Sequence, residues 1–300
     1  MTTLAPPSAA VPDDLKRLSL SPRRRITDAI AKALIWLSLA VAVVPLGLVT
    51  YYVIVKGSQV INWEFLTGRI PRQPQSESGG IGPAIAGTVL MTGVAAAIAI
   101  PLGVLGAIYL NEYGKRGPLA RTIRTMSDVM TGVPSVMMGL FIYIGFVLLT
   151  GEQNALAGAL ALACLMLPVI IRSTEEMLRL VPDELRQASL ALGARKWRTT
   201  VTVVLPAALS GIMSGSLLAI ARAAGETAPI VLVVGLTYRP NWSLFKGNTA
   251  LPAQIYSNAQ QPFDAAVNRA WGAALTLVVI VLITTLIGRF IANRFAIKER

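Results

Sequence analysis

The chain has 300 residues, of which 54% are hydrophobic and only 14% are charged, and its formal net charge is +12. Soluble domains carry about 25% charged residues, so this composition argues against a soluble globular enzyme and indicates an integral membrane protein. There is no histidine and a single cysteine, Cys164, which excludes His-dependent catalytic triads, His/Cys zinc clusters and an intrachain disulfide.

Six hydrophobic runs are candidates to cross a bilayer, for which a helix needs about 20 apolar residues. They are Ala33 to Val55, Pro83 to Leu110, Met126 to Leu149, Ala155 to Ile171, a long run from about Thr200 to Leu236, and Ala270 to Ala292. The first run lacks a small-residue cleavage pattern, so we expect it to be retained. The sequence therefore predicts an all-α integral membrane protein with six transmembrane helices and no sizeable soluble domain.

Basic residues are concentrated in alternate segments between these runs. If the N-terminus is cytoplasmic, the inside segments hold most of the 27 Lys and Arg residues, as the positive-inside rule requires. We therefore expect both termini in the cytoplasm, and we attribute the net charge to topology rather than to nucleic-acid binding. The predicted organisation is a disordered cytoplasmic tail over residues 1–32, a transmembrane domain over residues 33–292, and a cytoplasmic end over residues 293–300.

The segment of about residues 172–200, between the fourth and fifth runs, alternates basic and acidic residues. Pro182 followed by Asp183 is typical of a helix start, and Gly193 is typical of a helix end. Leucines and Ala188 supply an apolar face between them. On these residues alone, the segment is either an amphipathic connector or a docking helix.

Arg222 and Glu226 lie inside the fifth run, and their spacing of four places both on one face of a helix. A charged side chain at membrane depth costs about 2.5–3.5 kcal/mol on insertion scales, so we expect Arg222 to face a protein-lined or aqueous interior. The fifth run is too long for one untilted crossing. Gly225 and Pro229 therefore predict either a break or a marked tilt.

Two roles remain open for this pair on the residues alone. A guanidinium binds two phosphate oxygens at once, which Lys cannot do, so Arg222 is a candidate anion ligand on a translocation path. The pair is equally compatible with a salt bridge that only fixes helix packing. Ser135 and Thr88 are further candidate donors to an anion, although Ser and Thr in spans commonly bond to their own helix.

The segment QASLALG at 187–193, followed after nine residues by VVLP at 203–206, resembles the EAA signature of ABC importer permeases. Four positions match that signature, whereas Gln187, Ser189 and Val203 stand where the family has Glu, Ala and Ile. In that family this helix enters a cleft on the ATPase subunit and transmits its closure to the spans. The resemblance therefore implies an ATPase-coupling role for Glu184, Gln187, Ala188, Ser189 and Gly193.

Four further strings resemble, in order, the A-type permease subunits of phosphate-specific (Pst) ABC importers. They are GGIGPAIAGT at 79–88, GVPSVMMGLF at 132–141, ARAAGETAP at 221–229 and LPAQIY at 251–256. The resemblance implies the fold of type I ABC importer permeases, with a short cytoplasmic coupling helix. It also implies half of a translocation path for inorganic phosphate, lined by Arg222, Glu226, Ser135 and Thr88.

The same resemblance implies a set of partners in a bacterial plasma membrane. They are a second homologous permease subunit, a cytoplasmic ATPase dimer and an extracytoplasmic phosphate-binding protein. The chain contains no G-x-x-x-x-G-K-[ST] phosphate loop, so we do not expect it to be an enzyme that hydrolyses ATP. ATP and Mg²⁺ are expected on the partner ATPase, with no cofactor or metal on this chain.

Alternatives to phosphate import remain open. A permease for another oxyanion, such as sulfate or molybdate, is the nearest one, because the coupling segment is shared across importers. From a different class, an ion-coupled secondary transporter would use Arg222 and Glu226 as an exchange pair and would work without an ATPase. A membrane-embedded enzyme is less favoured because no nucleophile and base pair is evident.

Overall fold

The structure is a computed structural model that describes residues 22–114, 117–235 and 237–295, so most of the predicted tail and residues 296–300 lie outside it. Every regular element in the described part is helical, which confirms the all-α prediction. The chain divides into two compact units, one up to Tyr52 and one from Val53 onward.

The first unit contains most of helix α2, Pro22–Ser58. This helix begins within the segment predicted as tail and extends beyond the first predicted span at both ends. All its side chains from residue 23 to residue 52 are exposed, including Trp36 at 70%. An apolar helix of this kind needs lipid or another protein around it.

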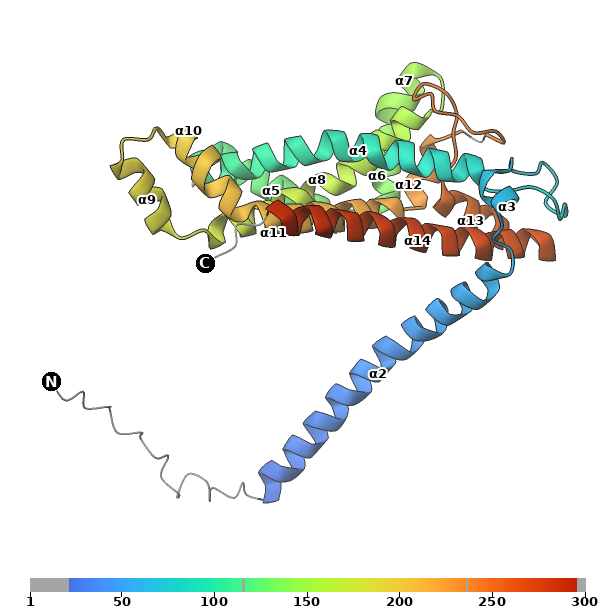
Figure 1. Ribbon diagram of the computed structural model, residues 1–300, viewed down its shortest axis with the longest axis horizontal. Helices are drawn as coiled ribbons and strands as arrows, with labels where there is room; N and C mark the ends of the chain where they lie inside the picture. Colours follow the sequence, from blue (N-terminus) through green and yellow to red (C-terminus); the bar gives the residue numbers. More distant parts are fainter. Residues whose placement is uncertain (1–21, 115–116, 236, 296–300) are drawn as a thin grey trace. The chain divides into compact units, whose positions relative to one another are not determined.

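The second unit is a helix bundle centred on α8, Ala155–Leu180, which packs against α4, Gly82–Ile108, and α11, Leu205–Ala224. Helix α14, Asp264–Phe295, packs against α11 (Figure 1). The buried core contains many alanines together with a few larger side chains such as Met166. Small residues let helix backbones approach closely, which is how helices pack in membranes.

Five described helices are long and apolar enough to cross a membrane, or six crossings if one bent pair counts as a span. The bent pair consists of α5, Pro118–Gly132, and the helical segment that begins with α6, Ser135–Ile142, at an angle of 110°. The predicted span from Met126 to Leu149 therefore corresponds to a bent pair of helices, which is one crossing if both parts belong to the same span. Pro134 explains the bend, because a residue before proline avoids the helical region and Val133 is indeed extended.

The fifth hydrophobic run is broken, which decides between the two predicted options. Helix α11 ends at Ala224, Gly225 forms its C-cap, and α12, Ala228–Val233, follows after two further residues. Upstream, a π-helical segment, Thr200–Val204, connects α11 to α10, Lys196–Thr199. Arg222 therefore lies in the last turn of α11, and Glu226 lies in the break between α11 and α12.

Two other spans extend beyond their predicted ends. Helix α8 continues to Leu180 rather than Ile171, and α14 begins at Asp264 rather than Ala270. Two short helices, α3, Trp63–Thr67, and α13, Leu251–Ala259, were not predicted. The extensions were missed because polar residues end a hydrophobic run even where a folded chain buries and pairs them.

Helix α9, Asp183–Ala191, lies at one end of the bundle, whereas α3 and α13 lie towards the other end (Figure 1). Both of its predicted boundaries are confirmed. Pro182 is the N-cap residue, and Gly193 has a φ of +81°, in the left-handed region that favours glycine.

Candidate functional site

Arg222 and Glu226 form an ion pair at the break between α11 and α12. The Nε atom of Arg222 lies 3.7 Å from Oε1 of Glu226, which is too long for a hydrogen bond. The Arg222 side chain is 63% exposed, whereas that of Glu226 is 18% exposed. The guanidinium is therefore neutralised only loosely and remains accessible from outside this chain.

Arg222 continues an exposed stripe along α11, in which Ser214 and Leu218 precede it at intervals of four residues. The opposite face of the helix buries Ile212 and Ala219 in the bundle. This chain alone does not enclose Arg222, so a protein-lined or aqueous interior around it stays a prediction. Its environment must be completed by water or by another subunit.

Thr88 lies beside Glu226, because both line one small void of about 10 Å³. Oγ1 of Thr88 donates to Ala84 O at 2.8 Å and accepts from the backbone N–H of Leu251 at 2.8 Å. Its proton is therefore already engaged, and the hydroxyl fixes the N-terminus of α13. These contacts favour a structural role for Thr88 over the predicted donation to an anion.

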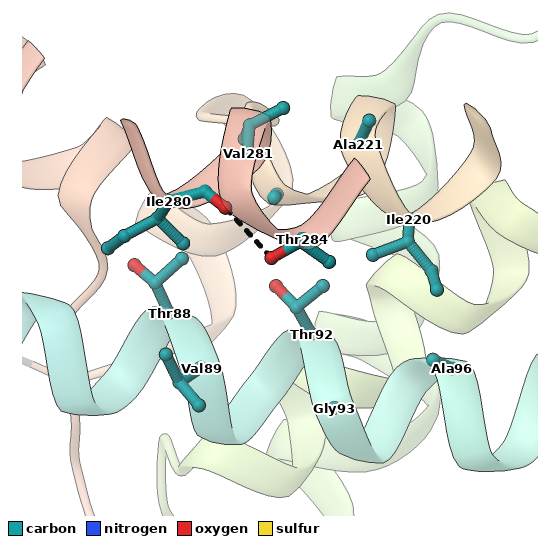
Figure 2. A pocket seen from close by; sticks show the side chains of 11 residues that line it. Thr88, Val89, Thr92, Gly93, Ala96, Ile220, Ala221, Ile280, Val281 and Thr284 are labelled. Carbon is teal, nitrogen blue, oxygen red and sulfur yellow. Dashed lines mark hydrogen bonds between the residues drawn. The ribbon is translucent and has the colours of Figure 1, made fainter. Parts of the chain in front are cut away.

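A larger cavity of about 250 Å³ adjoins this void between α4, α11 and α14. Figure 2 shows Thr88 and Thr92 projecting from α4 towards α14, where Oγ1 of Thr284 donates to Ile280 O at 2.8 Å. The rest of the lining is apolar and includes no charged residue. Among the described residues, this cavity therefore offers an anion only threonine hydroxyls and no charged donor.

Ser135 is half-buried at the start of α6, directly after the bend. It lines neither of these two cavities. Helix α6 packs against α12 through Gly139, where an added Cβ would lie 2.7 Å from Cα of Pro229. The structure thus brings the helix of Ser135 against α12 without joining Ser135 to the ion pair by any hydrogen bond among the described residues.

The five predicted coupling residues lie on α9 or just after it. All are exposed except Ser189, which is half-buried and whose Oγ lies 2.9 Å from Oγ1 of Thr199. Leu185, Leu190 and Leu192 are 45%, 48% and 90% exposed on the same segment. Apolar side chains left exposed on a polar helix are typical of a protein-binding surface.

Arg186, which the sequence interpretation treated only as one of the charges of the loop, ties α9 to the bundle. Its guanidinium donates to Leu178 O at 2.8 Å, to Val181 O at 2.6 Å and to Oε1 of Glu112 at 3.1 Å. The two side chains of this ion pair are 16% and 8% exposed. Glu112 lies in the π-helical turn that follows α4, Tyr109–Gly114, 74 residues away in sequence.

A second buried carboxylate connects α8 to α5. Oε1 of Glu175 accepts from Nε of Arg124 at 2.9 Å and from Nη2 of Arg179 at 2.6 Å. The side chain of Glu175 is only 2% exposed. Arg124 also donates to Leu110 O at 2.9 Å. Together with Arg186, this network holds the α9 end of the bundle in place, and the sequence interpretation missed it.

The fold and these two sites define a class of protein, a multi-pass α-helical membrane protein with a short exposed helix at one end of its bundle. The chain belongs to the family described as "Binding-protein-dependent transport system inner membrane component", whose model matches residues 99–297. Such a component is a non-catalytic part of a transport system.

Individual proteins agree with this assignment. The chain is 45% identical over 285 residues to "Phosphate transport system permease protein PstA 1" of Mycobacterium tuberculosis, covering 92% of each chain. It is 44% identical over 282 residues to "Phosphate transport system permease protein PstA" of Mycobacterium leprae, again covering 92% of each.

Among solved structures, it resembles a bacterial alginate ABC transporter in complex with an alginate pentasaccharide-bound periplasmic protein. The TM-score is 0.63 at 15% identity, over 91% of this chain and 97% of that chain. The fold is therefore that of type I ABC importer permeases.

Proposed function

We propose that this chain is a permease subunit of an ATP-driven importer of inorganic phosphate and lines half of its translocation path. The observation that carries the proposal is an arginine within a membrane-spanning helix whose side chain is 63% exposed on the surface of its own chain. The names of the similar permeases support phosphate as the substrate.

Physical chemistry supports a pathway role for Arg222. A lipid-facing arginine costs about 2.5–3.5 kcal/mol on insertion scales, so its face of α11 requires a second subunit and water. The guanidinium matches phosphate oxygens two at a time. Glu226 at 3.7 Å offsets part of the positive charge. The anion is then held firmly enough to enter and weakly enough to leave.

Helix α9 is the proposed contact with a cytoplasmic ATPase that binds ATP and Mg²⁺. Its exposed leucines supply an apolar surface, and Arg186 fixes it to the bundle. Basic residues concentrate at this end of the helices, which supports a cytoplasmic location of α9 and of both chain termini in a bacterial plasma membrane. The remaining proposed partners are a homologous second permease and an extracytoplasmic phosphate-binding protein. The solved alginate transporter is likewise in complex with a substrate-bound periplasmic protein.

The proposal is tested by reconstituting the chain with its second permease, ATPase and binding protein in proteoliposomes. We expect uptake of labelled phosphate that requires both ATP and the loaded binding protein. Excess sulfate or molybdate should leave this uptake unchanged. Uptake that either of those anions suppresses, or that an ion gradient drives without ATP, would contradict phosphate import by this mechanism.

Replacing Ala188 tests the α9 contact. Ala188 is exposed in the middle of α9, so Ala188→Phe adds bulk where another protein should approach closely. Overpacking costs about 1–3 kcal/mol, and we therefore expect the ATPase activity stimulated by the loaded binding protein to fall roughly tenfold. Ala188→Ser nearly preserves the volume and is expected to keep the stimulation. Unchanged stimulation in Ala188→Phe would show that α9 does not contact the ATPase.

A further inference from the structure

Arg269 is a buried cation in the second turn of α14, only 4% exposed. Its terminal nitrogens donate to the backbone carbonyls of Pro74, at 2.5 Å, and of Ser76, in the loop before α4 at residues 68–81. Its Nε has no hydrogen-bond partner among the described residues. Arginine carries five N–H donors, and buried charges are normally paired. The carbonyls leave the positive charge of Arg269 unbalanced.

A cavity of about 110 Å³ adjoins Arg269, and no carboxylate of the described residues lines it. We call it the Arg269 cavity. Its polar lining consists of Arg269, Arg72, Tyr238, Gln254, Ser257, Asn258 and Gln261. Asn258 is 6% exposed, and its Nδ2 has no hydrogen-bond partner among the described residues. Arg269 and Asn258 both line this cavity and each carries one unsatisfied buried donor, which is costly unless it binds an acceptor.

A second arginine, Arg72, lines the Arg269 cavity, and two more are sequence neighbours of Ile70 and Tyr238, which line it. The N–H of Ile70 donates to Tyr238 O at 3.2 Å and thereby joins the loop before α4 to the segment before α13. The guanidinium of Arg72 lies 5.9 Å from the centre of the Tyr238 ring. Arg69 and Arg239 are exposed neighbours of the two joined residues. This end of the bundle is therefore suited to attract an anion.

Acidic residues are present on another side of Arg269. Glu77 and Asp264, both exposed, line a separate hollow that Arg269 also reaches. The described hydrogen bonds of Arg269 nevertheless go to backbone carbonyls and not to these acids. Neither acid lines the Arg269 cavity, and neither forms a hydrogen bond with Arg269 among the described residues.

We propose that the Arg269 cavity binds one inorganic oxyanion, with Arg269 and Asn258 as donors inside and Arg72 at the rim. Its volume of about 110 Å³ equals roughly three to four waters at about 30 Å³ each, which is room for one tetrahedral anion. The proposal rests on the proposed function, in which that anion is phosphate. The cavity is then an acceptor site where the anion arrives from the binding protein before it reaches Arg222.

A cysteine reporter tests the site without relying on transport. Ser257→Cys, in a Cys164→Ala background and in the complete importer in nanodiscs, places an exposed thiol on the cavity wall. A negatively charged methanethiosulfonate should label it faster than a positively charged one. Inorganic phosphate should slow labelling about threefold at twice its dissociation constant, because protection follows 1 + [L]/Kd.

Two isosteric substitutions make the test specific. Asn258→Asp places a carboxylate beside Arg269 and should abolish both the charge preference and the protection. Asn268→Asp makes the same change on the other side of Arg269, in the hollow with Glu77, and should preserve both. Should Asn258→Asp fail to assemble, Arg72→Gln at the exposed rim is expected to weaken protection by itself.

The labelling results distinguish failure of the proposed oxyanion site from failure of the proposed phosphate import. Protection by acetate but not by phosphate would overturn the proposal, because the cavity would then take a protein carboxylate. No protection by any anion would also overturn it and leave Arg269 as a support for the loop. Protection by sulfate instead of phosphate would support the oxyanion site while contradicting phosphate as the substrate.

Discussion

Arg222→Lys is expected to lower phosphate uptake by the reconstituted importer about tenfold, and Arg222→Gln about 100-fold. Hydrogen bonds to charged groups are worth roughly 1.5–3 kcal/mol, and each 1.4 kcal/mol is a factor of ten. Lysine keeps the charge but loses the paired donors that fit phosphate, whereas glutamine loses the charge as well. Initial rates of labelled phosphate uptake, at equal amounts of assembled complex, measure the effect.

Arg289 on α14 offers a matched control, since it is also an exposed arginine within a membrane-spanning helix. Arg289→Lys should leave uptake at the wild-type rate. Co-purification of the ATPase and the second permease establishes that each variant assembles. Wild-type uptake in a fully assembled Arg222→Lys complex would show that the ion pair with Glu226 only fixes helix packing.

Hydrophobic runs located the membrane helices well but not their directions or full lengths. The apolar content of Met126 to Leu149 predicted one span but not the 110° angle between the two helices that form it. The predicted span ended before the end of α8 because the charged Glu175 interrupts the hydrophobic run. In the structure, Glu175 forms an ion pair with Arg124, 51 residues away. Such long-range pairing leaves no trace in the local pattern.

The site residues that were predicted correctly depend on local spacing, whereas those that were missed depend on long-range contacts. Arg222 and Glu226 were paired correctly because the i, i+4 spacing is local. Thr88 was predicted as an anion donor, but its hydroxyl accepts from the N–H of Leu251, 163 residues later. Arg186 and Glu112 are 74 residues apart, so the sequence around either residue does not predict their contact.

These long-range contacts suggest how movement of α9 reaches the ion pair. Arg186 joins α9 to Glu112, in the turn at one end of α4. Thr88, in the second turn of α4 at the opposite end of that helix, lines the void beside Glu226. Helix α4 is continuous from Gly82 to Ile108 and leads directly into the turn that contains Glu112. A displacement of α9 by the ATPase is thus expected to move α4 and change the surroundings of Glu226.

Arg186→Gln should therefore uncouple the importer. We expect ATP hydrolysis to continue while phosphate carried per ATP falls about 5- to 150-fold, the range that corresponds to coupling free energies of about 1–3 kcal/mol. Removing one partner of a buried ion pair also costs about 3–5 kcal/mol, so thermal stability of the assembled complex must be followed in parallel. Parallel assays of uptake and ATP hydrolysis in the same proteoliposomes measure the ratio.

Asp183→Asn is the matched control, because it removes the other carboxylate paired with Arg186, at 3.0 Å, whose side chain is 81% exposed. An exposed salt bridge is worth about 0–1 kcal/mol, so this variant should transport normally. If Arg186 acts through Glu112, the double variant Glu112→Gln, Arg186→Gln should be no worse than Arg186→Gln alone. Additive losses would assign Arg186 a direct contact with the ATPase instead, and the link through α4 would then carry no coupling.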